Sequence, residues 1–130
     1  MTKNKHDAEP QPYPQVTIHG ACPSKSNCYK VVQLGGHGSL AKKDALAAYE
    51  QSFFMQNPLR RARIARRFKL TVDVYYKSDL PDLDNALKIL LDCLQMCETI
   101  VNDRLCAEIH ARKFIDKVNP RVVFTIEELM

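Results

Sequence analysis

Acidic residues and one lysine interrupt an otherwise apolar stretch of the sequence. Asp82 and Asp84 flank a leucine, Lys88 follows Asp84 by one helical turn, and Asp103 comes nineteen residues after Asp84. Two carboxylates placed two residues apart can converge on one cation. Mg²⁺ suits such a pair because it needs only one or two carboxylates together with waters and phosphate oxygens. The pattern therefore indicates a metal-dependent phosphodiester site, with Asp103 as a third carboxylate from the next element.

A helix over residues 83–96 must carry most of this site. Asp82 follows a proline and is predicted to cap the start of this helix through its carboxylate. Asp84, Lys88 and Asp92 step by four residues and form a polar stripe along one face. The opposite face is apolar and recurs at the three-and-four spacing of a helix, through Leu83, Ala86, Leu87, Leu90, Leu91 and Leu94.

Each of these features also has a simpler explanation. Asp82 alone could be only a helix cap. Asp84 and Lys88 could form only a surface ion pair, worth about 0.3–0.5 kcal/mol. The Asn102-Asp103 pair could be only a turn. Together, however, they form a pattern that matches a known protein family: Asp-x-Asp-Asn-x-x-Lys on a leucine-backed helix, followed by a short loop that ends in Asp.

This stretch resembles the RusA family of Holliday junction resolvases. The resemblance implies a Mg²⁺-dependent, homodimeric endonuclease that resolves four-way DNA junctions by paired symmetric nicks in DNA recombination and repair. By position, it implies Asp82, Asp84 and Asp103 as metal ligands and Lys88 as a catalytic residue. The matching segments are Asp82-Leu83-Asp84-Asn85, Lys88, Leu91-Asp92, Asn102-Asp103-Arg104, His110-Ala111-Arg112-Lys113 and residues 120–127, with a weaker match over residues 22–27.

Further polar residues are expected to support the metal ligands without holding the metal. These are Asn85, Asp92 and Asn102. Two positions depart from the family pattern. Many members have Asp-Asp where this chain has Asn102-Asp103, and some have arginine where it has Pro81. The second departure, Pro81, replaces a residue that is expected to contact a phosphate.

The densest positive charge of the sequence lies in residues 60–69, where six cations occur without an acid. Beside a phosphodiester site, such a run is expected to follow the DNA backbone through salt-dependent contacts that are blind to sequence. An alternative is a non-catalytic nucleic-acid-binding module that uses this run, with the carboxylates as caps and turn formers. The expected DNA-contacting residues are Lys25, Asn27, Arg60, Arg61, Arg63, Arg66, Arg67, Arg112 and Lys113.

The length of 130 residues suits one domain, which we expect over residues 15–130 after a proline-rich, charged tail at 1–14. Hydrophobic periodicity predicts the order strand, helix, strand, helix, strand, strand. This is an α+β domain with a mixed sheet covered by two main helices. The elements are expected at residues 15–19, 39–56, 68–76, 83–96, 105–112 and 121–126, with a long loop over residues 22–39.

The sequence contains five cysteines and carries a net charge of +4. The odd cysteine count favours buried or half-buried thiols over a disulfide framework. A zinc site drawn from Cys22, Cys28, Cys93 and Cys97 would lack the usual spacing of two residues between ligands. No apolar run approaches the roughly 20 residues of a membrane span. We therefore expect a cytoplasmic protein without a membrane partner, and the resemblance fits an origin in a phage or integrated element.

Overall fold

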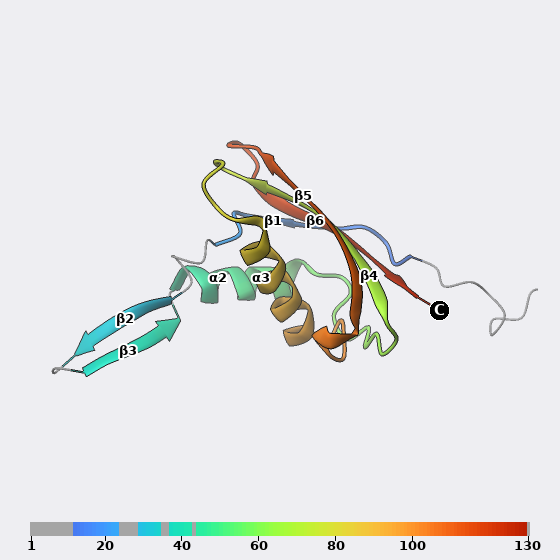
Figure 1. The fold of residues 1–130 in the computed structure, drawn as a ribbon, viewed down its shortest axis with the longest axis horizontal. Helices are drawn as coiled ribbons and strands as arrows, with labels where there is room; N and C mark the ends of the chain where they lie inside the picture. The colour runs from blue at the N-terminus through green and yellow to red at the C-terminus, as the bar shows by residue number, and fades with distance from the viewer. Residues whose placement is uncertain (1–11, 24–28, 35–36, 43, 130) are drawn as a thin grey trace, which may run out of the picture.

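The main body of the protein is a four-stranded mixed sheet. The computed structural model of the chain describes residues 12–23, 29–34, 37–42 and 44–129 (Figure 1). The strands lie in the order β1-β6-β4-β5, and only the β4–β5 pair is parallel. They are β1 (Val16–His19), β4 (Phe68–Tyr76), β5 (Cys106–Ile115) and β6 (Arg121–Glu128). The structure confirms the predicted α+β class with a mixed sheet.

The inner strand β4 has one buried face and one half-buried face. Its side chains alternate strictly between buried and half-buried, because successive residues of a strand point to opposite faces. The half-buried set, which includes Asp73 and Tyr75, lies on the opposite face. The buried set is Phe68, Leu70, Val72, Val74 and Tyr76.

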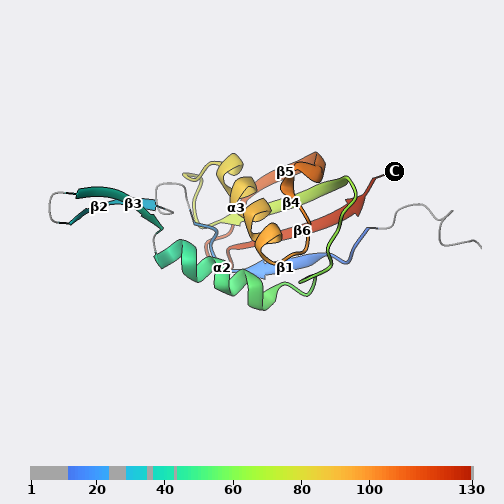
Figure 2. The same cartoon turned by 90° about the horizontal axis from the view of Figure 1, so that it is seen from below.

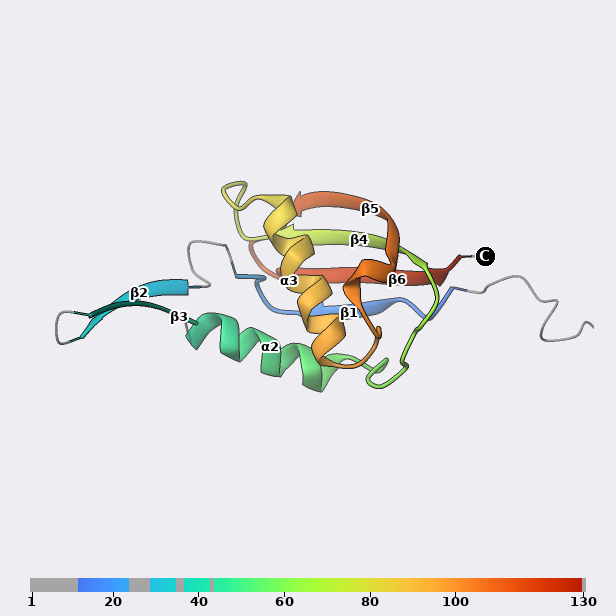
Figure 3. The same cartoon turned by 60° about the horizontal axis from the view of Figure 1, so that its bottom comes forward.

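Two helices pack on the buried face of the sheet, α2 (Asp44–Gln56) and α3 (Leu83–Met96) (Figures 2 and 3). The bounds of α3 confirm the predicted helix over residues 83–96. α2 contacts the sheet through Phe53, whose ring stacks on that of Phe124 with centroids 6.0 Å apart. No helix in the described part of the chain covers the other face of the sheet. No helix there is long and apolar enough to cross a membrane either.

Residues 29–42 correct two sequence predictions. They form an antiparallel hairpin, β2 (Tyr29–Leu34) and β3 (His37–Lys42), in place of a loop and a helix starting at Ser39. The β-branched Val31 and Val32 favour a strand. The sequence between the two strands is Gly-Gly, a dipeptide that two-residue hairpins prefer. The hairpin forms a separate two-stranded sheet that projects from the main body (Figure 1).

The extended chain before β1 is held against β6. The backbone N–H of Tyr13 donates to the carbonyl of Ile126 at 2.8 Å, and its hydroxyl donates to Glu128 at the same distance. Desolvation and the Glu128 carboxylate raise the pKa of Tyr13 to about 12. Tyr13 lies inside the predicted tail, residues 1–14. Residues 1–11 of that tail lie outside the described part of the chain.

The Phe53–Phe124 stack generates a stability prediction. Phe53→Ala should lower the free energy of unfolding by about 3–5 kcal/mol, because it leaves a cavity between α2 and the sheet. Urea unfolding followed by circular dichroism measures this loss. The matched control is Phe54→Ala, since Phe54 is 39% exposed and contacts Arg60 at the surface. Equal losses for the two variants would contradict the assignment of Phe53 as the link between α2 and the sheet.

Candidate active site

The start of α3 presents two carboxylates to solvent. Asp82 occupies the N-cap position with extended backbone, yet its side chain makes no capping hydrogen bond, so the predicted carboxylate cap is wrong. Its backbone carbonyl instead accepts from the hydroxyl of Tyr76 at 3.0 Å. Asp84 follows in the first turn and is exposed. Neither carboxylate pairs with a described residue, so both are available to a cation.

The polar stripe of α3 is confirmed as an exposed face. Asp84, Lys88 and Asp92 are all exposed, and the described residues provide no ion pair for any of them. The simple reading of Asp84 and Lys88 as a surface ion pair therefore does not describe this structure. The Cα of Lys88 lies one turn beyond that of Asp84, about 6 Å further along the helix axis.

Asn85 and Asn102, which are expected to support the metal ligands, both bond to backbone groups. The Asn85 amide donates to the carbonyl of Pro23 at 3.1 Å, which ties α3 to the chain just before residues 24–28. The Asn102 side chain accepts from the backbone N–H of Arg104 at 2.9 Å and caps a short 3₁₀ turn, η2 (Asp103–Leu105). Neither amide is hydrogen-bonded to a carboxylate of the described residues. Their support of metal ligands stays a prediction.

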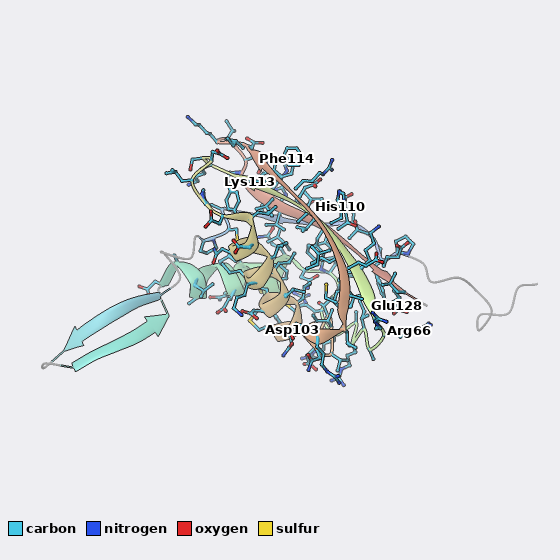
Figure 4. The ribbon with its side chains drawn as sticks, in the orientation of Figure 1. Arg66, Asp103, His110, Lys113, Phe114 and Glu128 are labelled. Atoms are coloured by element: carbon cyan, nitrogen blue, oxygen red, sulfur yellow. The ribbon has the colours of Figure 1, made fainter. Side chains whose placement is uncertain are left out.

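Asp103 lies at the opposite end of α3 from the other two carboxylates. Its backbone N–H donates to the side chain of Gln95, in the last turn of α3, at 2.9 Å. Gln95 is eleven residues after Asp84, which corresponds to about 16 Å along a helix. Figure 4 shows Asp103 beside the C-terminal end of the helix.

The parallel strand β5 independently places Asp103 far from the start of α3. Asp103 precedes the start of β5, whereas Lys113 near its end contacts Asp79 at 3.1 Å, just before the start of α3. Cys106 and Lys113 are seven residues apart, which corresponds to about 23 Å of strand. Among the described residues, no three His, Cys, Asp or Glu side chains gather closely enough to hold a metal. One chain thus brings together Asp82 and Asp84 but not Asp103.

The arginine-rich segment is fastened to the chain that leads into Asp103. We call residues 57–64 and 97–101 the arginine strap, because their backbones run side by side. Arg61, Arg63 and Ile64 donate backbone hydrogen bonds to residues 97, 98 and 99, each at 2.9 Å. Val101 returns one to the carbonyl of Ile64 at 3.0 Å. The strap therefore sets the position of the arginines relative to Asp103.

The strap holds its backbone in an unusual conformation. Arg61, Arg63 and Glu98 have φ angles of 61°, 52° and 56°, and they are the non-glycine residues with positive φ in the described part. Such a conformation costs about 1–3 kcal/mol per residue and persists only where surrounding contacts enforce it. All three residues lie in the strap, so its hydrogen bonds offset this cost.

Two buried polar side chains help to hold the backbone of the strap in this conformation. Asn57 and Thr99 are both 0% exposed. The Asn57 amide donates to the Thr99 hydroxyl at 2.8 Å, and that hydroxyl donates to the carbonyl of Leu59 at 2.9 Å. Sequence reasoning missed both residues, because a single asparagine and a single threonine carry no local signal of a contact across 42 positions.

The arginines of the strap and the residues after it are exposed. Arg63 pairs with Glu98 at 2.9 Å, and Arg66 approaches Glu128 at 3.8 Å. Arg60 donates to the carbonyl of Phe54 at 2.8 Å. Arg61 and Arg67 have no ion pair with a described residue. Described acids therefore neutralise only a minor part of the positive charge of residues 60–69.

The other expected DNA contacts differ in their surroundings. Arg112 donates twice to Asp73, at 2.8 and 2.9 Å, and Lys113 pairs with Asp79. Both charges are thus satisfied within the chain, which lowers their value as phosphate contacts. Lys25 and Asn27 lie outside the described residues.

Four cysteines lie among the described residues, and their thiols are buried or half-buried. Cys22, Cys93 and Cys97 carry buried thiols in the core, as the sequence predicts, and Cys106 is half-buried. Burial raises the pKa of Cys93 well above its ordinary value, and it also raises those of Cys97 and Cys106. These thiols are therefore poor nucleophiles at neutral pH. Cys28 lies outside the described residues.

Comparison with known families identifies the chain. The family described as endodeoxyribonuclease RusA matches residues 23–127, which include α3, Asp103 and the arginine run. The chain therefore belongs to the RusA family and is an endodeoxyribonuclease of the crossover-junction type. Its place is in DNA recombination and repair, as a DNA-binding nuclease. No curated protein matches the sequence.

The buried hydroxyl of Thr99 generates the prediction for this site. Thr99→Val should lower the free energy of unfolding by about 1–3 kcal/mol, because it leaves the Asn57 amide and the Leu59 carbonyl without partners. Thr99→Ser keeps the hydroxyl and should lose only about 1 kcal/mol for the missing methyl group. Urea unfolding compares the two. A valine variant as stable as the wild type would show that the strap does not depend on this hydroxyl.

Proposed function

We propose that this endonuclease uses Mg²⁺ and cuts four-way DNA junctions by paired symmetric nicks. One observation carries the proposal. Two exposed carboxylates, which pair with none of the described residues, and one exposed lysine lie at the start of a helix that the RusA family match includes. Exposed carboxylates in this arrangement suit a cation and a phosphate better than they suit a structural role.

Asp82 and Asp84 would hold the metal ion. Their donor set fits Mg²⁺, which binds through one or two carboxylates and fills its remaining positions with waters and substrate phosphate oxygens. When bound, Mg²⁺ supplies charge neutralisation at the scissile phosphate and acidifies a water molecule. The exposed position of both residues at the helix start leaves room for a DNA backbone to approach.

Lys88 would act on the same phosphate. Its ammonium projects from the face of α3 that carries Asp84, and no described acid neutralises it. Three N–H donors on a positive charge can stabilise the additional negative charge that the phosphate oxygens gain in the transition state. Because the lysine sits on a rigid helix, this charge is in place before the substrate binds.

Two arguments support a homodimer. Symmetric cuts in a junction of near-twofold symmetry need two active sites related by a twofold axis, which a C2 dimer provides. In addition, α3 separates Asp103 from Asp82 and Asp84 by about 16 Å within one chain. A second copy that runs in the opposite direction brings its own Asp103 toward the other end of α3. Each site would then contain Asp82, Asp84 and Lys88 from one copy and Asp103 from the other.

The removal of one carboxylate tests the site. Asp84→Asn should lower junction cleavage by about a hundredfold or more, because the metal loses one of its charged ligands. Folding and junction binding should remain nearly unchanged, since Asp84 is exposed and pairs with no residue in the described part of the chain. The assay uses an end-labelled, immobile four-way junction with Mg²⁺ or EDTA, beside linear duplex of the same sequence. Asp44→Asn is the matched control, because Asp44 is an exposed aspartate in the first turn of α2.

The basic segment gives a separate test of DNA binding. The double variant Arg61→Ala/Arg67→Ala should weaken binding to all sequences alike and reduce the salt slope of log K by about 2, because each arginine releases about one counterion. Titrations at several NaCl concentrations measure this slope. Lys117→Ala, an exposed cation in the β5–β6 turn, should leave the slope unchanged.

The cleavage assay also distinguishes the proposed nuclease from the alternative of a non-catalytic nucleic-acid-binding module. Wild-type protein that binds junctions under every divalent metal tried without cutting them would support a non-catalytic binding module. Full cleavage by the purified Asp84→Asn protein would contradict the assignment of the metal site and leave the family activity intact.

A further inference from the structure

The loop that leads from β4 into α3 is held at both ends by one tyrosine. We call residues 77–82 the entry loop, because Asp82 at its end is a proposed metal ligand. Tyr76 is the last residue of β4 and is 1% exposed. Its backbone carbonyl accepts from the N–H of Asp116 at 2.7 Å, and its hydroxyl donates to the carbonyl of Asp82 at 3.0 Å. Tyr76 therefore fixes the start of the entry loop through its backbone and the end through its side chain.

Lys113 of β5 holds the middle of the entry loop. Its ammonium donates to the backbone carbonyl of Asp79 at 2.8 Å and contacts the Asp79 carboxylate at 3.1 Å. The same ammonium lies 5.9 Å from the centroid of the Tyr76 ring, within the range of a cation–π interaction. Figure 4 shows Lys113 near this loop. One lysine thus contacts both the entry loop and the ring whose hydroxyl binds Asp82.

The two proposed ligands at the start of α3 differ in what holds them. Asp84 lies in the first turn, so the hydrogen bonds of the helix fix its backbone. Asp82 is the N-cap residue, with φ −86° and ψ 140°, and lies outside the helix. A ligand on the end of a loop needs support from neighbouring groups if it is to be in place before the metal binds. Asp82 is therefore the ligand that depends on Tyr76.

An aspartate at the N-cap position ordinarily turns its carboxylate toward the helix. There it accepts from the second or third backbone N–H of the first turn, which in α3 belong to Asp84 and Asn85. A carboxylate oxygen used in this way is less available to a cation. The Asp82 side chain makes no such hydrogen bond, and the Tyr76 hydroxyl binds the backbone of the same residue. The tyrosine thus holds the residue where its carboxylate stays exposed.

We propose that Tyr76 is a positioning residue for the metal ligand Asp82, and that Lys113 supports this role by holding the Tyr76 ring and the entry loop. The hydroxyl fixes the Asp82 backbone, so the carboxylate is available to the same cation as that of Asp84. This inference rests on the metal site of the proposed function. It assigns Lys113 to the support of that site, in place of the DNA contact that the sequence predicts.

Removal of one oxygen atom tests the role of Tyr76. Tyr76→Phe keeps the buried ring and should raise the dissociation constant for Mn²⁺ by about tenfold, because loss of a group that supports a ligand weakens metal binding by about 10–100-fold. Mn²⁺ takes the same oxygen ligands as Mg²⁺, and the electron paramagnetic resonance signal of free Mn²⁺ reports binding without catalysis. Tyr13→Phe is the matched control. It removes a hydroxyl that binds Glu128 at 2.8 Å and should leave the Mn²⁺ affinity unchanged.

Two further measurements distinguish positioning of a ligand from support of the fold. In Tyr76→Phe, the Mg²⁺ concentration for half-maximal junction cleavage should rise by the same factor as the Mn²⁺ dissociation constant, and excess Mg²⁺ should restore the cleavage rate. Junction binding in EDTA should equal that of the wild type. If Tyr76→Phe loses junction binding in EDTA and excess Mg²⁺ does not restore cleavage, the hydroxyl supports the fold and the positioning role is overturned.

Lys113 has a separate test against its alternative role. Lys113→Met removes the charge and keeps an apolar side chain of similar length, so it should weaken Mn²⁺ binding severalfold and leave the salt slope of junction binding unchanged. A lysine that binds a phosphate would behave in the opposite way: the slope would fall by about 1 and the Mn²⁺ affinity would not change. Lys117→Met, at an exposed lysine of the β5–β6 turn, should change neither quantity.

The results distinguish the positioning role from the proposed function. If the wild type binds Mn²⁺ and cuts junctions, and Tyr76→Phe and Lys113→Met bind Mn²⁺ as tightly as it does, the positioning role is overturned and the nuclease function stands. A wild type that binds no Mn²⁺ and cuts no junction with any divalent metal would contradict the proposed function, and the positioning role with it.

Discussion

The hydroxyl of Thr99 connects parts of the molecule that are far apart in the sequence. It accepts from Asn57 across 42 positions and donates to Leu59, with no exposure to water. Around it, three residues adopt left-handed backbone conformations that isolated residues avoid. These hydrogen bonds fix the arginines of the strap relative to the chain that enters Asp103, so DNA bound as proposed along the arginines would meet Asp103 at a fixed offset.

Helix α3 separates the two parts of the proposed catalytic site. Asp82, Asp84 and Lys88 are at its start, whereas Asp103 is held at its last turn by Gln95. Because the helix cannot shorten, a single chain cannot bring all three carboxylates to one ion. Symmetry then serves two purposes in the proposed dimer: it completes each site, and it sets the spacing between the two cuts.

Local patterns predicted the parts of the fold that local physics decides. The alternation of Phe68 to Tyr76 and the leucine spacing of α3 gave correct elements, and Asp84 and Lys88 were placed on the exposed face of α3. The hairpin over residues 29–42 was missed because its Gly-Gly signal was treated as a loop. The Asp82 cap was wrong because Tyr76 binds the backbone carbonyl and leaves the carboxylate exposed. The position of Asp103 depends on tertiary contacts with Gln95 and the strap, which no sequence spacing contains.

The pairing of β1 with β6 has a consequence for biosynthesis. Val16 lies opposite Phe124, so the first strand of the main sheet pairs only with its last strand. During translation, β1 emerges about a hundred residues before β6 and has no partner in the main sheet until β6 has left the ribosome. Contacts across such long sequence separations slow folding, because loop closure must precede them. The main sheet is therefore completed only once β6 has been synthesised, and a chain truncated before β6 would expose the apolar faces of β1 and β4 together.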